Sequence, residues 1–174
     1  ERPFVVINGD ILSSIDIQKI LDGHERSKAT VTLGLKDEPR FNGVQVAGDG
    51  RILSFAGGSA TGLAFTGIHL LDPEALDGIP DDSPTSIIDC YLQLLSSGAK
   101  VMAHAVKNQF WGELGSLEGY LQAHVELSRM KTAPIPGLQV GGKPVIHESA
   151  RLGSGVIFVG TVCVGAGCEL NAGV

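Results

Sequence analysis

Residues 146–174, IHESARLGSGVIFVGTVCVGAGCELNAGV, repeat with a period of six. One phase carries a large apolar residue, a second phase carries a small apolar residue, and glycines fill the turns between them. A period of six fits neither an α-helix nor an array of hairpins, but it is typical of a left-handed parallel β-helix, whose coils contain three six-residue strands. The large residues of the first phase are Ile146, Leu152, Phe158, Val164 and Leu170.

The repeat predicts a β-helix over residues 145–174 that is incomplete. These residues make fewer than two coils, whereas roughly three repeats are needed for a stable stack. The sequence reaches Val174 in the middle of a repeat, without a polar cap. We therefore expect a truncated β-helix whose open end associates with a second copy of the chain or with another segment.

The remainder of the chain alternates between strand and helix patterns. Residues 4–7, 29–35, 63–71 and 101–106 are rich in apolar and β-branched residues, and 43–55 has a hairpin pattern around an Asp-Gly turn. Such an order predicts an α/β domain over residues 1–130, with a mixed sheet. The predicted helices begin at Ser13 or Ser14, at Ser83 and at Ser116.

A proline- and glycine-rich stretch, residues 131–144, separates the two patterns and is predicted to be a linker. The net charge of −6 and the absence of a basic cluster argue against nucleic-acid binding. No signal peptide or apolar run of membrane length occurs in this sequence, so we expect a soluble cytoplasmic protein that does not bind membranes. The three cysteines, Cys90, Cys163 and Cys168, lack metal-ligand spacing and are expected to be small buried apolar residues.

Asp10 is the first candidate for chemistry. It follows the apolar strand at 4–7 within the turn Asn8-Gly9-Asp10, and ligands bind open α/β sheets at the carboxyl ends of strands. A carboxylate there could bind Mg²⁺. The spacing alone favours an ordinary Asn-Gly-Asp turn, so both interpretations stay open.

Three further positions are candidates on weaker patterns. Glu113 lies in a strand-to-helix loop, where it could be a second metal carboxylate or an ordinary loop residue. Gly67 interrupts a strand, which indicates either a close approach to a ligand or packing against a helix. His147 lies in the first hexapeptide, and it could be a general base of a β-helix acyltransferase, although a solvent-facing coil residue is favoured. No histidine pair has metal-ligand spacing.

Taken in order, the motifs resemble sugar-1-phosphate nucleotidyltransferases, above all the mannose-1-phosphate guanylyltransferase-like branch, in which a C-terminal left-handed β-helix is common. The resemblance covers essentially the whole chain. Its motifs precede the hexapeptides and are VVINGDIL (5–12), FNGVQVAGDGRILSF (41–55), LAFTGIHLLDPEAL (63–76), SIIDCYLQLLSSG (86–98) and WGELGSLEGYLQA (111–123).

The resemblance implies a Rossmann-like nucleotidyltransferase domain and a reaction. A sugar 1-phosphate oxygen attacks the α-phosphorus of an NTP and expels pyrophosphate, with Mg²⁺ and hydrogen-bond donors stabilising the charge on the phosphoryl oxygens. It assigns Asp10 and Glu113 to Mg²⁺ and Gly67, with its neighbour Thr66, to the substrate. It assigns no catalytic residue with certainty within these 174 residues.

The sequence departs from this family pattern at three places. The glycine-rich signature GGxGTRLxPLT, which binds the triphosphate, is absent from these residues, and Glu113 replaces an aspartate. Residues 55–58 read Phe-Ala-Gly-Gly where relatives often have F-x-E-K-P. We therefore expect that this chain alone does not catalyse nucleotidyl transfer. A non-catalytic regulatory paralogue and a hexapeptide acyltransferase remain the alternatives.

Overall fold

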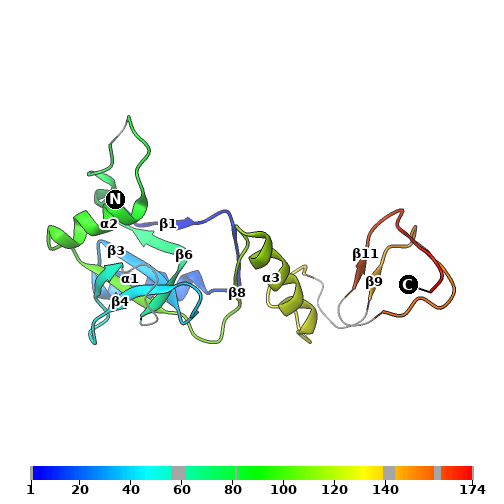
Figure 1. Cartoon of the computed structure of the whole chain (residues 1–174). Coiled ribbons are helices and arrows are strands. Elements are labelled where there is room, and N and C mark those ends of the chain that lie inside the picture. Colours follow the sequence, from blue (N-terminus) through cyan, green and yellow to red (C-terminus); the bar gives the residue numbers. More distant parts are fainter. Residues whose placement is uncertain (1, 56–61, 81, 139–143, 159–161, 174) are drawn as a thin grey trace. The chain divides into compact units, whose positions relative to one another are not determined.

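Figure 1 shows a computed structural model of the chain, which describes residues 2–55, 62–80, 82–138, 144–158 and 162–173. The chain divides into two compact units, Glu1–Trp111 and Gly112–Val174. The predicted motif at 55–58 lies mostly outside the described residues. Among the helices in the described ranges, none is long and apolar enough to cross a bilayer.

In its described residues, the first unit contains a six-stranded sheet. The sheet is mixed, as the sequence predicts. The strand order is β5-β4-β6-β3-β7, and β1 also pairs with β6. β1 and β3 are both antiparallel to β6, and β7 is parallel to β3. The strands are β1 (Phe4–Ile7), β3 (Val31–Lys36), β4 (Asn42–Val46), β5 (Ile52–Phe55), β6 (Leu63–Leu71) and β7 (Val101–Ala105).

The two central strands are buried on both faces. Five consecutive residues of β3, from Val31 to Leu35, are buried, and so are the last six residues of β6. A strand covered on both sides is a continuous apolar run, which explains why these segments do not alternate between apolar and polar residues. The hairpin prediction is also confirmed, since β4 and β5 pair in antiparallel fashion around a turn that contains Asp49 and Gly50.

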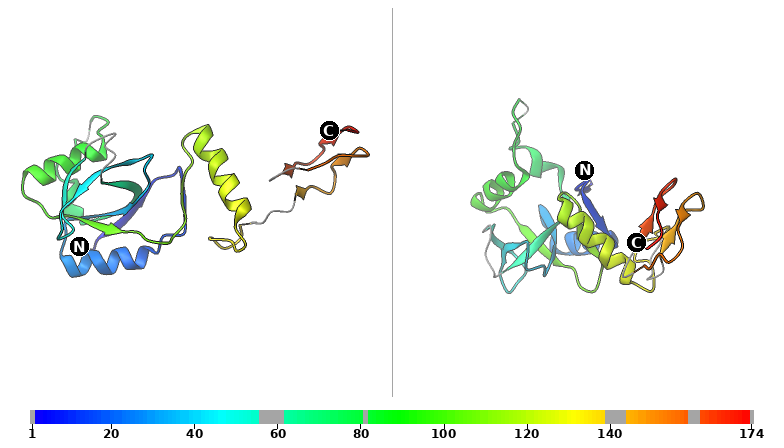
Figure 2. Two further views of the ribbon diagram at one scale, coloured as in Figure 1. Left: turned by 60° about the horizontal axis from the view of Figure 1, so that its bottom comes forward. Right: turned by 45° about the vertical axis from the view of Figure 1, so that its right-hand side comes forward.

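Two helices, α1 (Ile17–Ser27) and α2 (Ile87–Ser96), cover opposite faces of this sheet (Figure 2). Tyr91 of α2 packs into the core that contains Leu33, whereas Ile20 of α1 packs into a second core with Leu70. Short elements complete the unit: the strand β2 (Ile11–Ser13) and the 3-10 helix η1 (Pro73–Leu76).

Both predicted helix starts in this unit need correction. The cap of α1 is Asp16, whose side chain accepts a hydrogen bond from the Gln18 N–H, because Ser13 instead accepts from the Ile15 N–H in the turn before the helix. The cap of α2 is Ser86, three residues after the predicted Ser83.

The second unit contains α3 (Leu117–Arg129), and the strand β8 (Trp111–Glu113) runs into it. Ser116 caps α3 by accepting a hydrogen bond from the Gly119 N–H at 3.0 Å, which confirms the predicted start. Residues 131–138 contain no helix or strand.

The hexapeptide segment is the repeat at residues 145–174. Its described residues form two small parallel sheets. Val145 pairs with Cys163, and Arg151 pairs with Glu169, so each partner lies 18 residues further along the chain, which equals three hexapeptides. The described residues show these short ladders and not a full β-helix, because each strand contains only two residues. The strands are β9 (Val145–Ile146), β10 (Arg151–Leu152), β11 (Cys163–Val164) and β12 (Glu169–Leu170).

The burial predicted for the cysteines is correct only for Cys90. Cys163 and Cys168 are exposed free thiols. Of the large residues on the first phase of the repeat, Val164 is buried at 7% exposure, whereas Ile146 and Leu152 are 38% and 42% exposed. The interior of a coil is therefore open to solvent where no neighbouring coil covers it.

Candidate functional site

One edge of the sheet collects the carboxyl ends of three strands. β1 and β3 both run antiparallel to β6, and β7 runs parallel to β3, so all three end on the same side. Asn8 and Lys36 lie at or just after the ends of β1 and β3, beside the first half of β6, and Val106 follows β7 beside the end of β3. This is the edge at which open α/β sheets bind their ligands.

The turn Asn8-Gly9-Asp10 is anchored to β6 through Gly67. Ile7 pairs with Ile68, and the Asn8 N–H then donates to the Gly67 carbonyl at 2.9 Å. Asp10 is exposed and makes no hydrogen bond or ion pair with another described residue. The structure thus brings Asp10 and Gly67, two of the predicted site residues, to the same sheet edge.

Thr66 is fully buried, and its hydroxyl has partners within the sheet. The Oγ1 atom donates to the Gly34 carbonyl at 2.8 Å, and the Ile68 N–H lies 3.4 Å from it. The Thr66 carbonyl accepts a hydrogen bond from the Trp111 indole N–H at 2.8 Å. Its side chain therefore links β6 to β3. Substrate contact by Thr66 stays a prediction.

The sequence patterns do not single out Phe41, whose side chain is 40% exposed in the loop after β3. Trp111 supports its ring edge-on at 5.8 Å, and the Arg40 guanidinium lies 5.2 Å from the ring centroid. Phe41, Trp111 and the Thr66–Gly67 backbone form one continuous set of contacts in the first unit. The motif FNG at 41–43 gave a signal for a hairpin but none for an exposed aromatic ring.

Glu113 lies in the second unit and is braced by its own loop. Its Oε1 accepts the Gly115 N–H at 2.6 Å, and the Ser116 hydroxyl donates to Oε2 at 3.2 Å. These bonds hold the carboxylate in one orientation but leave lone pairs for a cation. Joint binding of one ion by Asp10 and Glu113 stays a prediction, and no cluster of three or more metal-ligating side chains occurs among the described residues.

A buried polar pair, His69 and Tyr91, lies in the core of the first unit. The His69 Nδ1 and the Tyr91 hydroxyl form a short hydrogen bond, while the His69 Nε2 has no partner among the described residues. Burial lowers the pKa of His69 to about 4 and raises the pKa of Tyr91. Both groups are therefore neutral near pH 7, and they sit between β6 and α2 rather than at the edge with Asp10.

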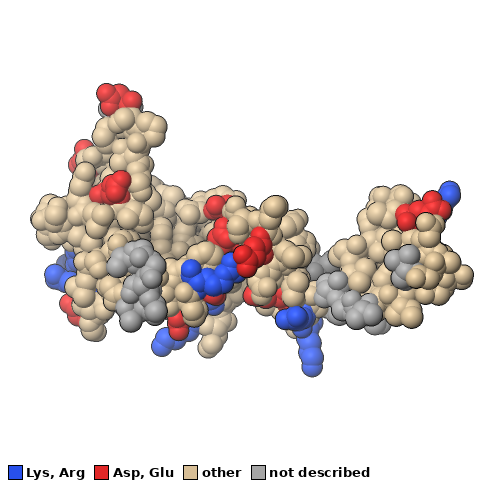
Figure 3. All heavy atoms as spheres, viewed as in Figure 1, with Lys and Arg blue, Asp and Glu red and all other residues tan. Residues whose placement is uncertain are grey.

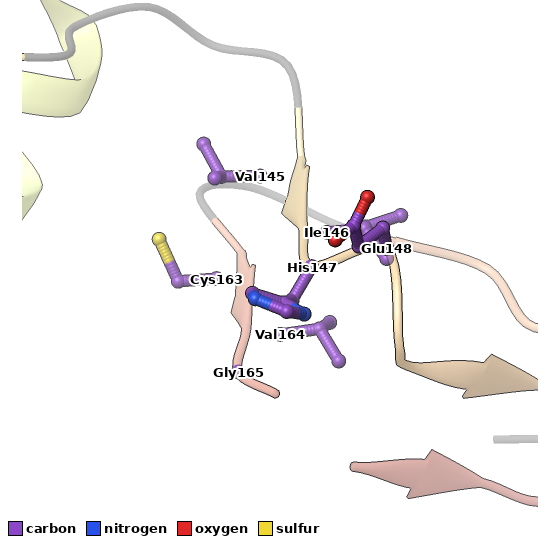
Figure 4. Close-up of a pocket in the computed structure, with 7 residues that line it drawn as sticks. All are labelled: Val145, Ile146, His147, Glu148, Cys163, Val164 and Gly165. Atoms are coloured by element: carbon purple, nitrogen blue, oxygen red, sulfur yellow. The ribbon is translucent and has the colours of Figure 1, made fainter. Parts of the chain in front are cut away.

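A pocket of about 520 Å³ lies in the hexapeptide segment (Figure 4). The Nδ1 of His147, a lining residue, lies 2.9 Å from the Ser149 hydroxyl and accepts the Ser149 N–H at 3.2 Å. The Ser149 hydroxyl oxygen in turn accepts the Gly167 N–H at 3.0 Å, which links positions 18 residues apart. The lining residues are Val145, Ile146, His147, Glu148, Cys163, Val164 and Gly165.

The charged side chains do not gather into a single basic patch on the face that Figure 3 displays. Lysine and arginine atoms lie there among aspartate and glutamate atoms. The candidate site is defined by the sheet edge and the Asp10 carboxylate.

Residues 1–129 match the sequence profile of a family described as nucleotidyl transferase. Among curated proteins, the chain is 28% identical over 177 residues to a mannose-1-phosphate guanylyltransferase of Mycobacterium tuberculosis, covering 97% of this chain and 49% of that protein. It is 30% identical over 203 residues to a UTP–glucose-1-phosphate uridylyltransferase of Synechocystis, covering 98% of this chain and 52% of that protein. The chain thus spans about half the length of the curated relatives it matches.

The fold also matches solved structures. A putative glucose-1-phosphate thymidylyltransferase from Bacillus anthracis, solved in complex with a sucrose, aligns with a TM-score of 0.61 at 20% identity. The alignment covers 75% of this chain and 56% of that one. At this identity the likeness concerns the fold alone.

Proposed function

The chain belongs to the nucleotidyl transferase family, and we propose that it forms the sugar-binding part of a sugar-1-phosphate nucleotidyltransferase. The reaction joins an NTP and a sugar 1-phosphate into an NDP-sugar and releases pyrophosphate. The family match over residues 1–129 carries this proposal. The curated relatives described above are a guanylyltransferase and a uridylyltransferase, so the proposal covers the reaction class and leaves the base and the sugar open.

The geometry of the sheet edge supports this function. An exposed carboxylate, Asp10, follows directly on the Asn8 anchor to Gly67. A hard cation needs oxygen ligands and room at a surface. Asp10 offers both, because its carboxylate is exposed and makes no hydrogen bond or ion pair with another described residue. Glu113 offers a second carboxylate whose orientation is fixed by the Gly115 N–H and the Ser116 hydroxyl.

Asp10, in the first unit, would hold the Mg²⁺ of this reaction, and the assignment of Glu113, in the second unit, to the same ion stays a prediction. When bound, the ion neutralises negative charge on the phosphoryl oxygens. The chain's own contribution is positional: the Asn8 anchor fixes the start of the Asp10 turn, and the Glu113 loop orients the second carboxylate. Asp10 fits a hard cation better than Glu113, since two hydrogen bonds already use part of the Glu113 carboxylate.

We further propose that the hexapeptide segment is part of a left-handed β-helix through which the protein associates. The 18-residue offset of both ladders supports this, since three six-residue strands make one coil. The exposed apolar residues Ile146 and Leu152 would be covered by a further coil from a second copy.

The proposal is tested first by cation binding. Titration of the chain with Mn²⁺, followed by water-proton relaxation, should show binding that Asp10→Asn weakens by at least tenfold, since removal of the charge removes the principal ligand. Asp82→Asn, at an exposed position, is the control and should leave binding unchanged. Equal binding by wild-type and Asp10→Asn protein would contradict the assignment of Asp10.

Catalysis is the second test. The chain is assayed with Mg²⁺, each common NTP and several hexose 1-phosphates, and pyrophosphate release is measured. We expect sugar 1-phosphate binding without turnover, since residues 1–174 carry no glycine-rich triphosphate loop. Turnover by the chain alone would show that it contains the whole phosphate chemistry. Absence of both sugar-phosphate and cation binding would favour a regulatory paralogue.

A further inference from the structure

Gly67 occupies a position that no other residue could take without movement of its neighbour. Its φ is +75°, a left-handed conformation that favours glycine. A Cβ atom built on Gly67 would lie 2.8 Å from the Asn8 Cγ and 2.9 Å from the Asn8 Nδ2. Both separations are well below van der Waals contact, so the Asn8 side chain fills the space that the missing Cβ leaves.

Asn8 is therefore held twice at one residue of β6. Its backbone N–H donates to the Gly67 carbonyl at 2.9 Å, and its side chain occupies the space that a Cβ atom of residue 67 would need. Beyond this point the chain leaves the ladder, and Asp10 follows two residues later with no described partner of its own. The contacts between Asn8 and Gly67 thus fix the point at which the turn to Asp10 begins.

Buried hydrogen bonds hold the segment of β6 that contacts Asn8. The Thr66 hydroxyl donates to the Gly34 carbonyl of β3 at 2.8 Å, and the Trp111 indole donates to the Thr66 carbonyl at 2.8 Å. Both bonds are buried, where a lost partner is costly. A change at Gly67 must consequently displace Asn8 rather than the β6 backbone.

From these contacts we infer that Asn8 is a positioning residue for the Asp10 carboxylate, and that position 67 is glycine because Asn8 occupies its Cβ space. This inference rests on the proposed function for the role of Asp10. It assigns Gly67 a different task from substrate contact: Gly67 acts on the reaction through Asn8 and the turn.

The test compares two glycines that share a left-handed backbone. Gly67→Ala introduces both the strained φ and the overlap with Asn8, whereas Gly98→Ala introduces the strained φ alone, since Gly98 has φ +81° and open space around its Cβ position. The readouts are Mn²⁺ affinity and the Asp10 amide resonance in a ¹⁵N–¹H spectrum. We expect Gly67→Ala to weaken Mn²⁺ binding at least tenfold and to move the Asp10 resonance. Gly98→Ala should change Mn²⁺ affinity by less than twofold and leave the Asp10 resonance unshifted.

A second comparison links the effect to Asn8. Asn8→Gly should by itself weaken Mn²⁺ binding and broaden or move the Asp10 resonance, because the side chain that seats the turn is gone. Adding Gly67→Ala to Asn8→Gly should then change Mn²⁺ affinity by less than threefold, because no overlap remains. If Gly67→Ala does not fold, Asn8→Gly alone decides, since it introduces no steric overlap.

The outcomes separate this inference from the proposed function. If the wild-type chain binds no Mn²⁺, the metal assignment of Asp10 fails, and the displacement of the Asp10 amide by Gly67→Ala and Asn8→Gly still decides the positioning role. An unmoved Asp10 resonance in both variants overturns the inference. So does a Gly67→Ala effect that equals Gly98→Ala, or one that persists unchanged in the Asn8→Gly background.

Discussion

The sheet of the first unit and the hexapeptide segment of the second unit are both rich in aliphatic residues, yet they bury them very differently. Five consecutive residues of β3 are buried between α1 and α2. In the hexapeptides, Val164 is buried, while Ile146 and Leu152 are 38% and 42% exposed. A layered domain supplies both covering faces within itself, whereas a solenoid coil depends on the coil next to it.

The first way to test this contrast is a pair of truncations. Leu33→Ala removes a fully buried side chain from the sheet, and we expect it to lower the free energy of unfolding by about 2 to 5 kcal/mol. Ile146→Ala removes a partly exposed side chain and should cost less than about 1 kcal/mol at protein concentrations at which the chains are dissociated. Urea unfolding followed by the fluorescence of Trp111, the single tryptophan, reports the first unit, and amide exchange in the β9–β11 ladder reports the region around Ile146.

Similar losses of unfolding free energy in Leu33→Ala and Ile146→Ala would contradict this difference in burial. A large effect of Ile146→Ala that grows with protein concentration would mean that Ile146 is covered in an assembly of chains. Light scattering on the same samples separates that outcome from an effect within one chain.

A pH titration sharpens the contrast, because the buried histidine belongs to the sheet. Burial lowers the pKa of His69 from 6.5 to about 4, so the unfolded chain binds more protons than the folded chain between these values. The free energy of unfolding that depends on a neutral His69 is therefore fully present above about pH 6.5. It falls as the pH drops toward 4, by about 3 kcal/mol in total. Burial also lowers the pKa of His104, which acts in the same direction.

The measurement is urea unfolding of the first unit at several pH values between 4 and 7.5. His69→Gln should flatten the dependence on pH, while His124→Gln, at an exposed position of α3, should leave it unchanged. A wild-type stability that is constant from pH 7 to pH 4.5 would contradict the burial of a neutral His69.

Much of the fold could be predicted because local patterns determine it. The apolar runs at 29–35 and 63–71 and the Asp-Gly turn predict the strands and the hairpin, and Ser116 caps α3 as expected. The other helix starts were misplaced because a serine has several uses. Ser13 bonds the Ile15 N–H in its own turn, and so the helix begins after Asp16.

The candidate site was harder to predict, because its contacts depend on register. The glycine within β6 was noticed as an interruption, but its partner follows only from the pairing of Ile7 with Ile68. Likewise, the spacing gave no indication that Trp111 supports Phe41 or that the His69 imidazole meets Tyr91. Residues far apart in sequence come together through strand order, which a local pattern does not contain.

The smallest expected effect concerns the connection between successive turns of the hexapeptide segment. The Ser149 hydroxyl oxygen accepts the Gly167 N–H at 3.0 Å and lies 2.9 Å from the His147 Nδ1. Ser149→Ala removes this link between positions 18 residues apart. Because the link is exposed, its loss should cost about 1 kcal/mol or less. We therefore expect amide exchange at Gly167 to accelerate by roughly fivefold, while the urea midpoint of the first unit stays unchanged.

Ser154→Ala is the matched control for that substitution, since Ser154 lies in the same repeat and makes no hydrogen bond with described residues. It should leave Gly167 exchange as in the wild type. If Ser149→Ala also leaves the exchange unchanged, the coil is held by its ladders alone, through bonds such as the Arg151 N–H to the Cys168 carbonyl at 2.8 Å. If instead Ser149→Ala lowers the urea midpoint of the first unit, the sheet and the hexapeptide segment unfold together. That result would contradict the view that the two regions are stabilised separately.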